Sequence, residues 1–219
     1  MVHCNNGASE LNAWATLFCE FADAIGSPAG SSEVFEPLFR ASLNAEPDGG
    51  GLLAYNYLSG EHITGFEEGR PLVLRTPDSR LTLANFIRSQ LYASLATLRI
   101  GMEVLLTDER VDLDTMFAHG GLFKTKGVAQ NYLAAAINAP VTVGEIAGEG
   151  GAWGMALLAG FMKDRRPGQA LCDYLATSIF AKAELESVDP DPADVAGFAA
   201  FLKRWTTGLA IETAALTVQ

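Results

Sequence analysis

A chain of 219 residues, 49% of them hydrophobic, is long enough for one large folded domain and too apolar for wholesale disorder. Its formal net charge of −11 argues against nucleic acid as a partner, because binding phosphates requires clustered Lys and Arg side chains. There is no basic-then-apolar leader, and no uncharged run approaches the ~20 residues of a membrane helix, so we expect no membrane insertion.

The three cysteines argue against a structural metal site. Cys4, Cys19 and Cys172 are far apart and odd in number, and they lack the Cys-x-x-Cys or Cys/His spacing of zinc ligands. Isolated thiols of this kind are typical of reduced proteins in the cytoplasm. We therefore expect free, mostly buried thiols, a cytoplasmic location and no zinc.

The first segments predict a strand followed by two helices. Residues 2–6 have the pattern of a strand already under way, which suggests that the natural protein begins further upstream. Apolar residues at helical spacing predict a helix that starts at Ser9 or Asn12, either of which is a suitable cap, and ends near Ile25. Ser32, with a glutamate nearby, predicts the start of a second helix over residues 34–44.

The middle of the chain predicts two strands and a long helix. Residues 52–58 form a mostly apolar run, which is typical of a buried strand, and a polar loop follows them. Residues 71–74 predict a second, shorter strand. Pro77 precedes a helix from about Thr82 to Leu106, and the apolar stripe of this helix indicates packing against the core.

A glycine pair follows the next expected strand. Residues 112–119 predict a strand, Gly120 and Gly121 come directly after it, and a helix is expected over residues 127–137. A strand, a glycine turn and a helix can bring bare main chain up to a nucleotide phosphate or base, because a Cβ would occupy the space of the ligand. By itself, however, such a pair is more often a plain turn.

The remaining segments continue the alternation of strands and helices. The expected elements are a strand over 140–143, a glycine-rich loop over 145–151, and helices over 152–161, 169–180 and 191–205. Gly151 and Gly154 are expected mainly to permit tight contact between a helix and a strand. This alternation predicts an α/β fold in which at least part of the sheet is parallel.

Three motifs in this order resemble the C-terminal domain of the FGGY carbohydrate kinases. They are LLAYNYLSGEHITGFEEGRPLVL, then AHGGLFKTKGVAQNYLAAAINAPV after a long helix, and finally EIAGEGGAWGMALLAG. The resemblance covers nearly the whole chain and implies a ribonuclease H-like, actin-like ATPase domain with a mixed sheet flanked by helices. It also implies that residues 1–219 are an excised nucleotide-binding domain without its N-terminal hairpin, which carries the family's Gly-Thr-Ser phosphate-binding sequence.

The resemblance implies that ATP lies beside the glycine turn. Gly120 and Gly121 match the family's glycine pair near adenosine and the α-phosphate, and Thr125 falls where relatives place a Ser or Asn against adenine. Lys124 joins this expected site because its charge suits a nucleotide, the alternative being that it only solvates the loop. Mg²⁺ is implied together with ATP, while the catalytic aspartate and the metal ligands are expected outside this chain.

The expected sugar depends on residues 57–61, which match the xylulokinase-like sequence YLSGER. His62 replaces the usual Arg of that sequence, and Ile63-Thr64 replaces the usual Thr-Pro, so the chain departs from the family pattern here. Xylulose is our first expectation. Ribulose is the second, because residues 120–140 match ribulokinase-like sequences without a gap.

Several functions remain open at this point. The first is the ATP-binding half of a kinase that transfers the γ-phosphate of ATP to a ketopentose hydroxyl. This half is expected to be inactive without an N-terminal domain that binds the sugar. The second is a non-catalytic, actin-like interaction module, and a weaker third is an α/β binding protein of another superfamily. An open strand edge also permits a homodimer.

Overall fold

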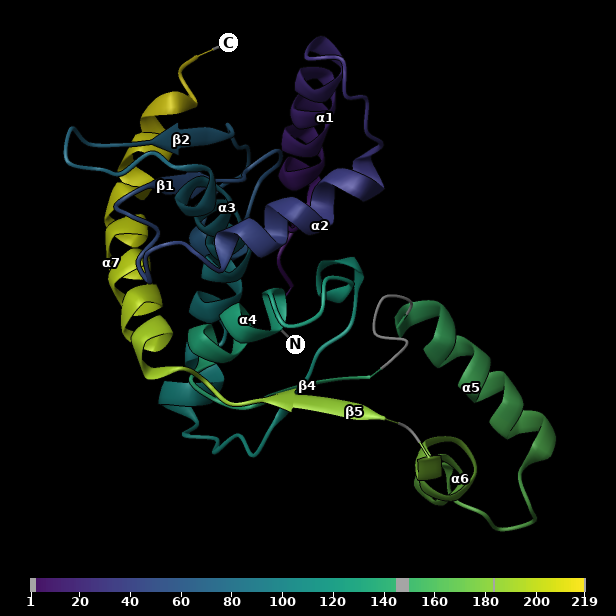
Figure 1. Ribbon diagram of the computed structural model, residues 1–219. Helices are drawn as coiled ribbons and strands as arrows, with labels where there is room; N and C mark the ends of the chain where they lie inside the picture. The colour runs from purple at the N-terminus through teal and green to yellow at the C-terminus, as the bar shows by residue number, and fades with distance from the viewer. Residues whose placement is uncertain (1–2, 145–149, 183, 219) are drawn as a thin grey trace.

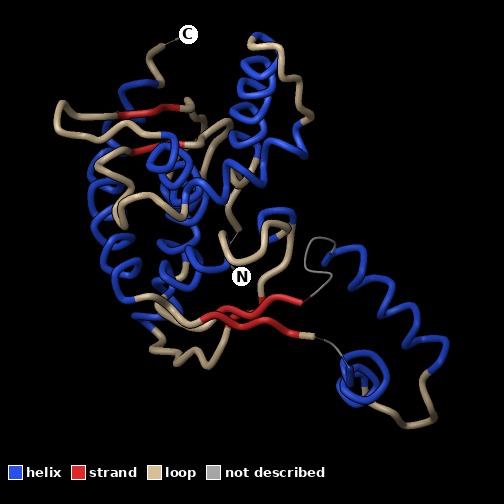
Figure 2. Tube along the Cα trace, in the orientation of Figure 1, coloured by secondary structure: helices blue, strands red, loops and turns tan. Residues whose placement is uncertain are grey.

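The computed structural model describes residues 3–144, 150–182 and 184–218. Within these ranges the chain is an α/β protein in which helices surround two small sheets (Figure 1; Figure 2). The α-helices are α1 (Ser9–Ala24), α2 (Ser31–Ser42), α3 (Leu83–Gly101), α4 (Ala129–Ile137), α5 (Gly150–Asp164), α6 (Leu171–Tyr174) and α7 (Pro192–Ala215). The strands are β1 (Leu53–Tyr55), β2 (Leu72–Leu74), β3 (Met116–Phe117), β4 (Val141–Gly144) and β5 (Leu185–Val188).

The two sheets differ in how their strands are paired. β1 and β2 are antiparallel, with Ala54 opposite Val73. In the second sheet β4 lies in the middle, with β3 parallel to it on one side and β5 antiparallel to it on the other. The expected combination of parallel and antiparallel strands is confirmed, although the strands at 52–58 and 112–119 are shorter than expected.

The first two helices confirm the helical periodicity but not the expected caps. α1 begins at Ser9, and no side chain caps it at Ala8. In α2 the main-chain N–H of Gly30 donates to the Glu33 carboxylate at 2.8 Å, so the expected cap at Ser32 is wrong. A carboxylate in the first turn is also favoured by the positive end of the helix dipole.

The long helix α3 starts where the sequence predicts it. The Thr82 hydroxyl accepts from the main-chain N–H of Asn85 at 3.1 Å, which satisfies one of the free donors of the first turn. Four members of the expected stripe are almost fully buried, namely Ile87, Leu91, Leu95 and Met102, the last of which lies just after the helix. The helix ends at Gly101, earlier than expected, and the chain then forms a π-helical turn at Val104–Asp108.

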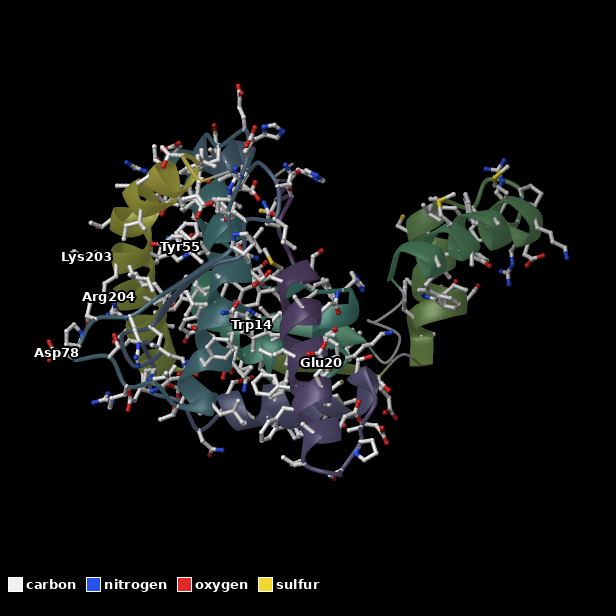
Figure 3. All side chains as sticks on the ribbon, turned by 90° about the horizontal axis from the view of Figure 1, so that it is seen from above. Trp14, Glu20, Tyr55, Asp78, Lys203 and Arg204 are labelled. Carbon is white, nitrogen blue, oxygen red and sulfur yellow. The ribbon has the colours of Figure 1, made fainter. Side chains whose placement is uncertain are left out.

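The core is well organised where α7 crosses β1. The rings of Tyr55 and Trp205 are stacked with their centroids 5.3 Å apart. The Tyr55 hydroxyl donates to the carbonyl of Trp205 at 2.9 Å, and the Trp205 indole N–H donates to the carbonyl of Ala54 at 2.8 Å. Figure 3 shows Tyr55 beside α7, with Lys203 on the outer side of that helix. These contacts fix α7 to the strand, since each buried polar group has a partner.

A buried guanidinium joins three helices. Arg88 of α3 lies over the rings of Tyr92 and Tyr132, with its central carbon 5.1 and 4.7 Å from the two ring centroids. It also forms an ion pair with Asp194 of α7 and donates to the Tyr92 hydroxyl at 2.7 Å. Burial of a charge is tolerated when it is paired in this way, so Arg88 fixes α3 against α4 and α7.

The two ends of the chain differ from the expectation. Val2 lies outside the described residues, and residues 3–6 form no strand. Near the other end, β5 is a strand that the sequence pattern did not indicate, and α7 extends to Ala215 instead of ending near Trp205. Between them, α5 and α6 lie apart from the rest of the protein in both Figure 1 and Figure 3.

Two further sequence expectations concern the thiols and the membrane. The three cysteines are free, but Cys172 is exposed and the other two are only half-buried, so the expected burial is wrong. Within the described part of the chain, we find no helix with both the length and the apolar character needed to cross a bilayer.

Candidate functional site

The candidate site is the loop that joins β3 to α4. At its start, the main-chain N–H of the buried Ala118 donates to the carbonyl of Thr142 in β4 at 2.9 Å. At its end the chain returns to the core at Val128, which is fully buried. The intervening residues 119–127, here called the glycine loop, are all exposed or half-buried. The loop therefore has two fixed ends and an accessible middle.

Gly120 and Gly121 present open main chain. Gly120 has a φ of +117°, a backbone conformation that residues other than glycine rarely adopt. A Cβ added at either position would meet no heavy atom within 4 Å. The chain continues as a 3-10 turn at Gly121–Phe123, in which the Phe123 N–H donates to the Gly120 carbonyl at 3.0 Å. The backbone conformation at position 120 thus requires glycine. At position 121 neither the backbone conformation nor crowding requires it.

Lys124 and Thr125 continue the same loop. Lys124 is exposed, and Thr125 is half-buried with its carbonyl accepting from the Val128 N–H at 3.4 Å. His119 and Lys126 are also exposed. The loop therefore combines open main chain, a hydroxyl and two exposed basic side chains, a set of groups suited to an anionic ligand.

The glycines of α5 do not have the expected packing role. A Cβ at Gly151 or at Gly154 would meet nothing within 4 Å, so neither residue permits a close approach to a strand. The expectation of tight contact there is wrong for the described residues. Residues 145–149, where a glycine-rich loop was expected, lie outside the described part of the chain.

The loop at residues 57–61 contains a buried carboxylate. The side chain of Glu61 is fully buried, and its Oε2 accepts from the main-chain N–H groups of Asn5 and Asn6 at 2.9 and 3.2 Å. Burial, followed by the nearby Glu61 charge, raises the pKa of the Cys4 thiol to about 11. Glu61 therefore holds the start of the chain in place. No local sequence signal connects these positions, which are 55 and 56 residues apart along the chain.

An open groove with a volume of about 550 Å³ lies at a different place, between the segment after η1 (His62–Thr64) and the end of α7. It is lined by Thr64, Gly65, Phe66, Glu67, Glu68, Thr213 and Leu216. Beside it, the hydroxyls of Tyr57 and Thr64 are 2.6 Å apart, and burial raises the pKa of Tyr57 to about 12. The groove includes no residue of the glycine loop.

The described carboxylates give no obvious catalytic or metal site. Asp112 and Asp114 are exposed, and Glu61 is occupied by main-chain donors. Among the residues that the structure describes, no group of three or more His, Cys, Asp or Glu side chains could hold a metal ion.

Sequence reasoning did not reveal the role of Gln130. Its side chain extends from α4 to the second sheet, where its amide donates to main-chain carbonyl groups of β4 and β5.

Comparisons with known proteins agree with this architecture. The C-terminal domain of the FGGY family of carbohydrate kinases matches residues 1–162. A search of curated proteins found no match. Among solved structures, the chain is similar to the xylulose kinase from Lactobacillus acidophilus, with a TM-score of 0.67 and 18% identity over 98% of this chain and 39% of that chain.

Two other solved kinases have the same fold. For the gluconate kinase from Lactobacillus acidophilus the TM-score is 0.65, with 17% identity over 97% of this chain and 39% of that chain. For the glycerol kinase from Plasmodium falciparum with ADP it is 0.58, with 17% identity over 81% of this chain and 33% of that chain. The chain spans about two fifths of the first two relatives. The fold is thus ribonuclease H-like, as in the C-terminal domains of these enzymes, and the chain belongs to the FGGY family of carbohydrate kinases.

Proposed function

We propose that this domain is the nucleotide-binding half of an ATP-dependent sugar kinase, with the glycine loop as its nucleotide site. The observation that carries the proposal is the open main chain at Gly120 and Gly121, in a loop fixed at both ends. Membership of the FGGY family and likeness to three sugar or polyol kinases support it.

The residues of the glycine loop fit a nucleotide. A Cβ at Gly120 or Gly121 would project into the open space beside the main chain, where the adenosine and α-phosphate would lie. Thr125 offers a hydroxyl to the base, and Lys124 offers positive charge to the phosphates. When bound, ATP with Mg²⁺ supplies the phosphoryl group that such kinases transfer, and their catalysis consists mainly of positioning and charge stabilisation.

We assign no catalytic base to this domain. A base must reach the attacking sugar hydroxyl, and the exposed Asp112 and Asp114 lie on the chain ahead of β3, while Glu61 already accepts main-chain donors. The carboxylate and the metal ligands would come from the rest of the protein. The domain alone is therefore expected to transfer no phosphate.

For the acceptor we propose a ketopentose, with xylulose first and ribulose second. The support is the match of residues 57–61 to the xylulokinase-like sequence and the structural similarity to the xylulose kinase from Lactobacillus acidophilus. A panel of ketopentoses, gluconate and glycerol, assayed with the full-length protein and ATP, tests the choice. Preference for glycerol or gluconate over every ketopentose would overturn it.

The substitution Gly121→Val tests the nucleotide site. Position 121 has open space and no left-handed φ, so the variant is expected to fold normally while its side chain blocks the ligand. In the full-length protein we expect the KM for ATP to rise about tenfold, equivalent to about 1.4 kcal/mol, and the KM for the sugar to stay constant. Gly7→Val is the matched control, because a Cβ there also meets nothing within 4 Å. A defect confined to the sugar would contradict the site.

A further inference from the structure

Both ends of the glycine loop are attached to neighbouring carbonyl groups of β4. On the incoming side, the Ala118 N–H donates to the carbonyl of Thr142 at 2.9 Å. On the outgoing side, the side-chain amide of Gln130, in the first turn of α4, donates to the carbonyl of Val141 at 2.9 Å. Because Val141 and Thr142 are consecutive, one short piece of strand holds both ends of the loop.

The Gln130 amide also reaches the third strand of this sheet. Its Nε2 donates to the carbonyl of Glu186 in β5 at 2.9 Å, so one NH₂ group bridges two adjacent strands. Carbonyl oxygens only accept, which means that the nitrogen of the amide, and not its oxygen, faces them. Figure 1 shows α4 next to the β4–β5 pair, as these bonds require.

The stability that Gln130 gains from its two hydrogen bonds is offset by the burial of its amide oxygen. The side chain is almost fully buried, and its Oε1 has no hydrogen-bond partner among the described residues. A buried amide oxygen without a partner loses its hydration and gains nothing in return. The distinctive effect of the side chain is therefore geometric: it fixes where the chain enters α4 relative to β4 and β5.

We propose that Gln130 is a positioning residue for the nucleotide. By holding the end of the glycine loop against β4 and β5, it keeps the main chain of residues 120–125 in the position that the nucleotide requires. It touches no ligand and acts through the loop. The inference rests on the proposed function, because it assumes that the loop binds the nucleotide.

Three variants separate positioning from general stability. Gln130→Met keeps the length of the side chain but removes both donations and the unpartnered oxygen. Gln130→Glu keeps the shape but places an oxygen against the two carbonyl groups, which repel it. Tyr132→Phe is the matched control, because it alters a buried residue of the same helix whose hydroxyl lies 2.9 Å from that of Ser42 in α2.

In the full-length protein, we expect Gln130→Met to raise the KM for ATP about tenfold, the equivalent of one well-placed hydrogen bond. The KM for the sugar and the kcat are expected to stay within about twofold, and Gln130→Glu to raise the ATP KM further. Tyr132→Phe is expected to lower the Tm and leave the ATP KM unchanged. Hydrogen exchange at residues 120–127 should be faster in Gln130→Met and normal in Tyr132→Phe.

The ATP KM of Gln130→Met is interpreted together with that of Gly121→Val. An elevated ATP KM in both Gly121→Val and Gln130→Met supports the positioning role. An elevated value in Gly121→Val alone overturns the role of Gln130 and leaves the proposed site intact. If neither variant changes it, the nucleotide site is elsewhere and both proposals fail. If Gln130→Glu does not fold, Gln130→Met alone decides the matter.

Discussion

Two pairs of glycines in this domain have opposite surroundings. A Cβ at Gly60 would overlap the carbonyl group of Glu67, and a Cβ at Gly69 would lie 2.5 Å from the Cβ of Tyr57. At Gly120 and Gly121 the same added atom would meet nothing within 4 Å. The first pair lets two stretches of main chain cross at close range. The second pair leaves a bare surface.

The comparison separates glycines that the fold requires from glycines beside open space, where we propose that a ligand binds. Crowding explains Gly60 and Gly69 completely, because a larger residue would displace backbone atoms. At Gly121 neither crowding nor a left-handed backbone requires glycine, which leaves the space beside it free for the ligand that we propose. That ligand is a nucleotide lying against the main chain.

The largest expected effect is a loss of stability when a Cβ is added to one of the crowded glycines, Gly60. Gly60→Ala would push a methyl group into the carbonyl of Glu67, and main chain cannot move aside as a flexible side chain can. We expect a loss of about 3 kcal/mol in the free energy of unfolding, at the upper end for overpacked sites. Chemical denaturation of this variant beside Gly121→Ala provides the measurement. Equal stability of the two variants would remove the distinction between the pairs.

A smaller effect is expected within the open pair itself. Gly120→Ala meets no atom, but φ at this position is +117°, which costs about 1–2 kcal/mol for a residue with a Cβ. Gly121→Ala has no such penalty, so its stability is expected to match that of the wild type. Denaturant midpoints of the two variants test this. A loss at 121 as large as that at 120 would show that the turn is more constrained than its open surroundings indicate.

The smallest expected effect is the pH dependence of stability that comes from the buried Glu212. Burial raises the pKa of Glu212 above its ordinary 4.5, while the Arg70 main-chain donation and charge oppose the shift. A raised pKa in the folded protein means that this group's stabilising contribution is complete below about pH 4.5. It is lost as pH rises through the folded pKa. Glu212→Gln should reduce the loss of stability above pH 4.5 by less than about 1 kcal/mol, because the Arg70 donation and charge offset part of the effect of burial.

Denaturation of wild type and Glu212→Gln at several pH values gives this difference directly. A stability difference between the two proteins that is the same at every pH would contradict the titration of Glu212. The open pair provides the internal comparison, because Gly121→Ala adds no titratable group and should follow the pH dependence of the wild type.

Local signals explain why some elements were predictable. Thr82 ahead of an apolar stripe correctly located the start of α3, and Asp191, whose side chain accepts from two main-chain N–H groups, did the same for α7. β5 had no such signal, because the exposed residues of Leu185–Val188 form a strand only through pairing with β4. Pairing partners forty residues away cannot be found from periodicity.

The same division applies to the candidate site. The glycine loop could be located because Gly120, Gly121, Lys124 and Thr125 lie within six consecutive residues between a strand and a helix. Gln130 could not, because its partners are carbonyl groups, and any residue type presents a carbonyl. The contacts of Asn5 and Asn6 with Glu61 were missed for the same reason.

β4 and β5 are in register from Val141 opposite Val188 to Gly144 opposite Leu185, while α5 and α6 come between them in the sequence. The pairing of these two strands thus closes a long connection that contains α5 and α6. Lengthening such a connection costs little conformational entropy, about 0.6 kcal/mol for each doubling of a flexible segment. The exposed bend at residues 165–168, between α5 and α6, is accordingly a suitable place to insert a reporter or an affinity tag into this protein.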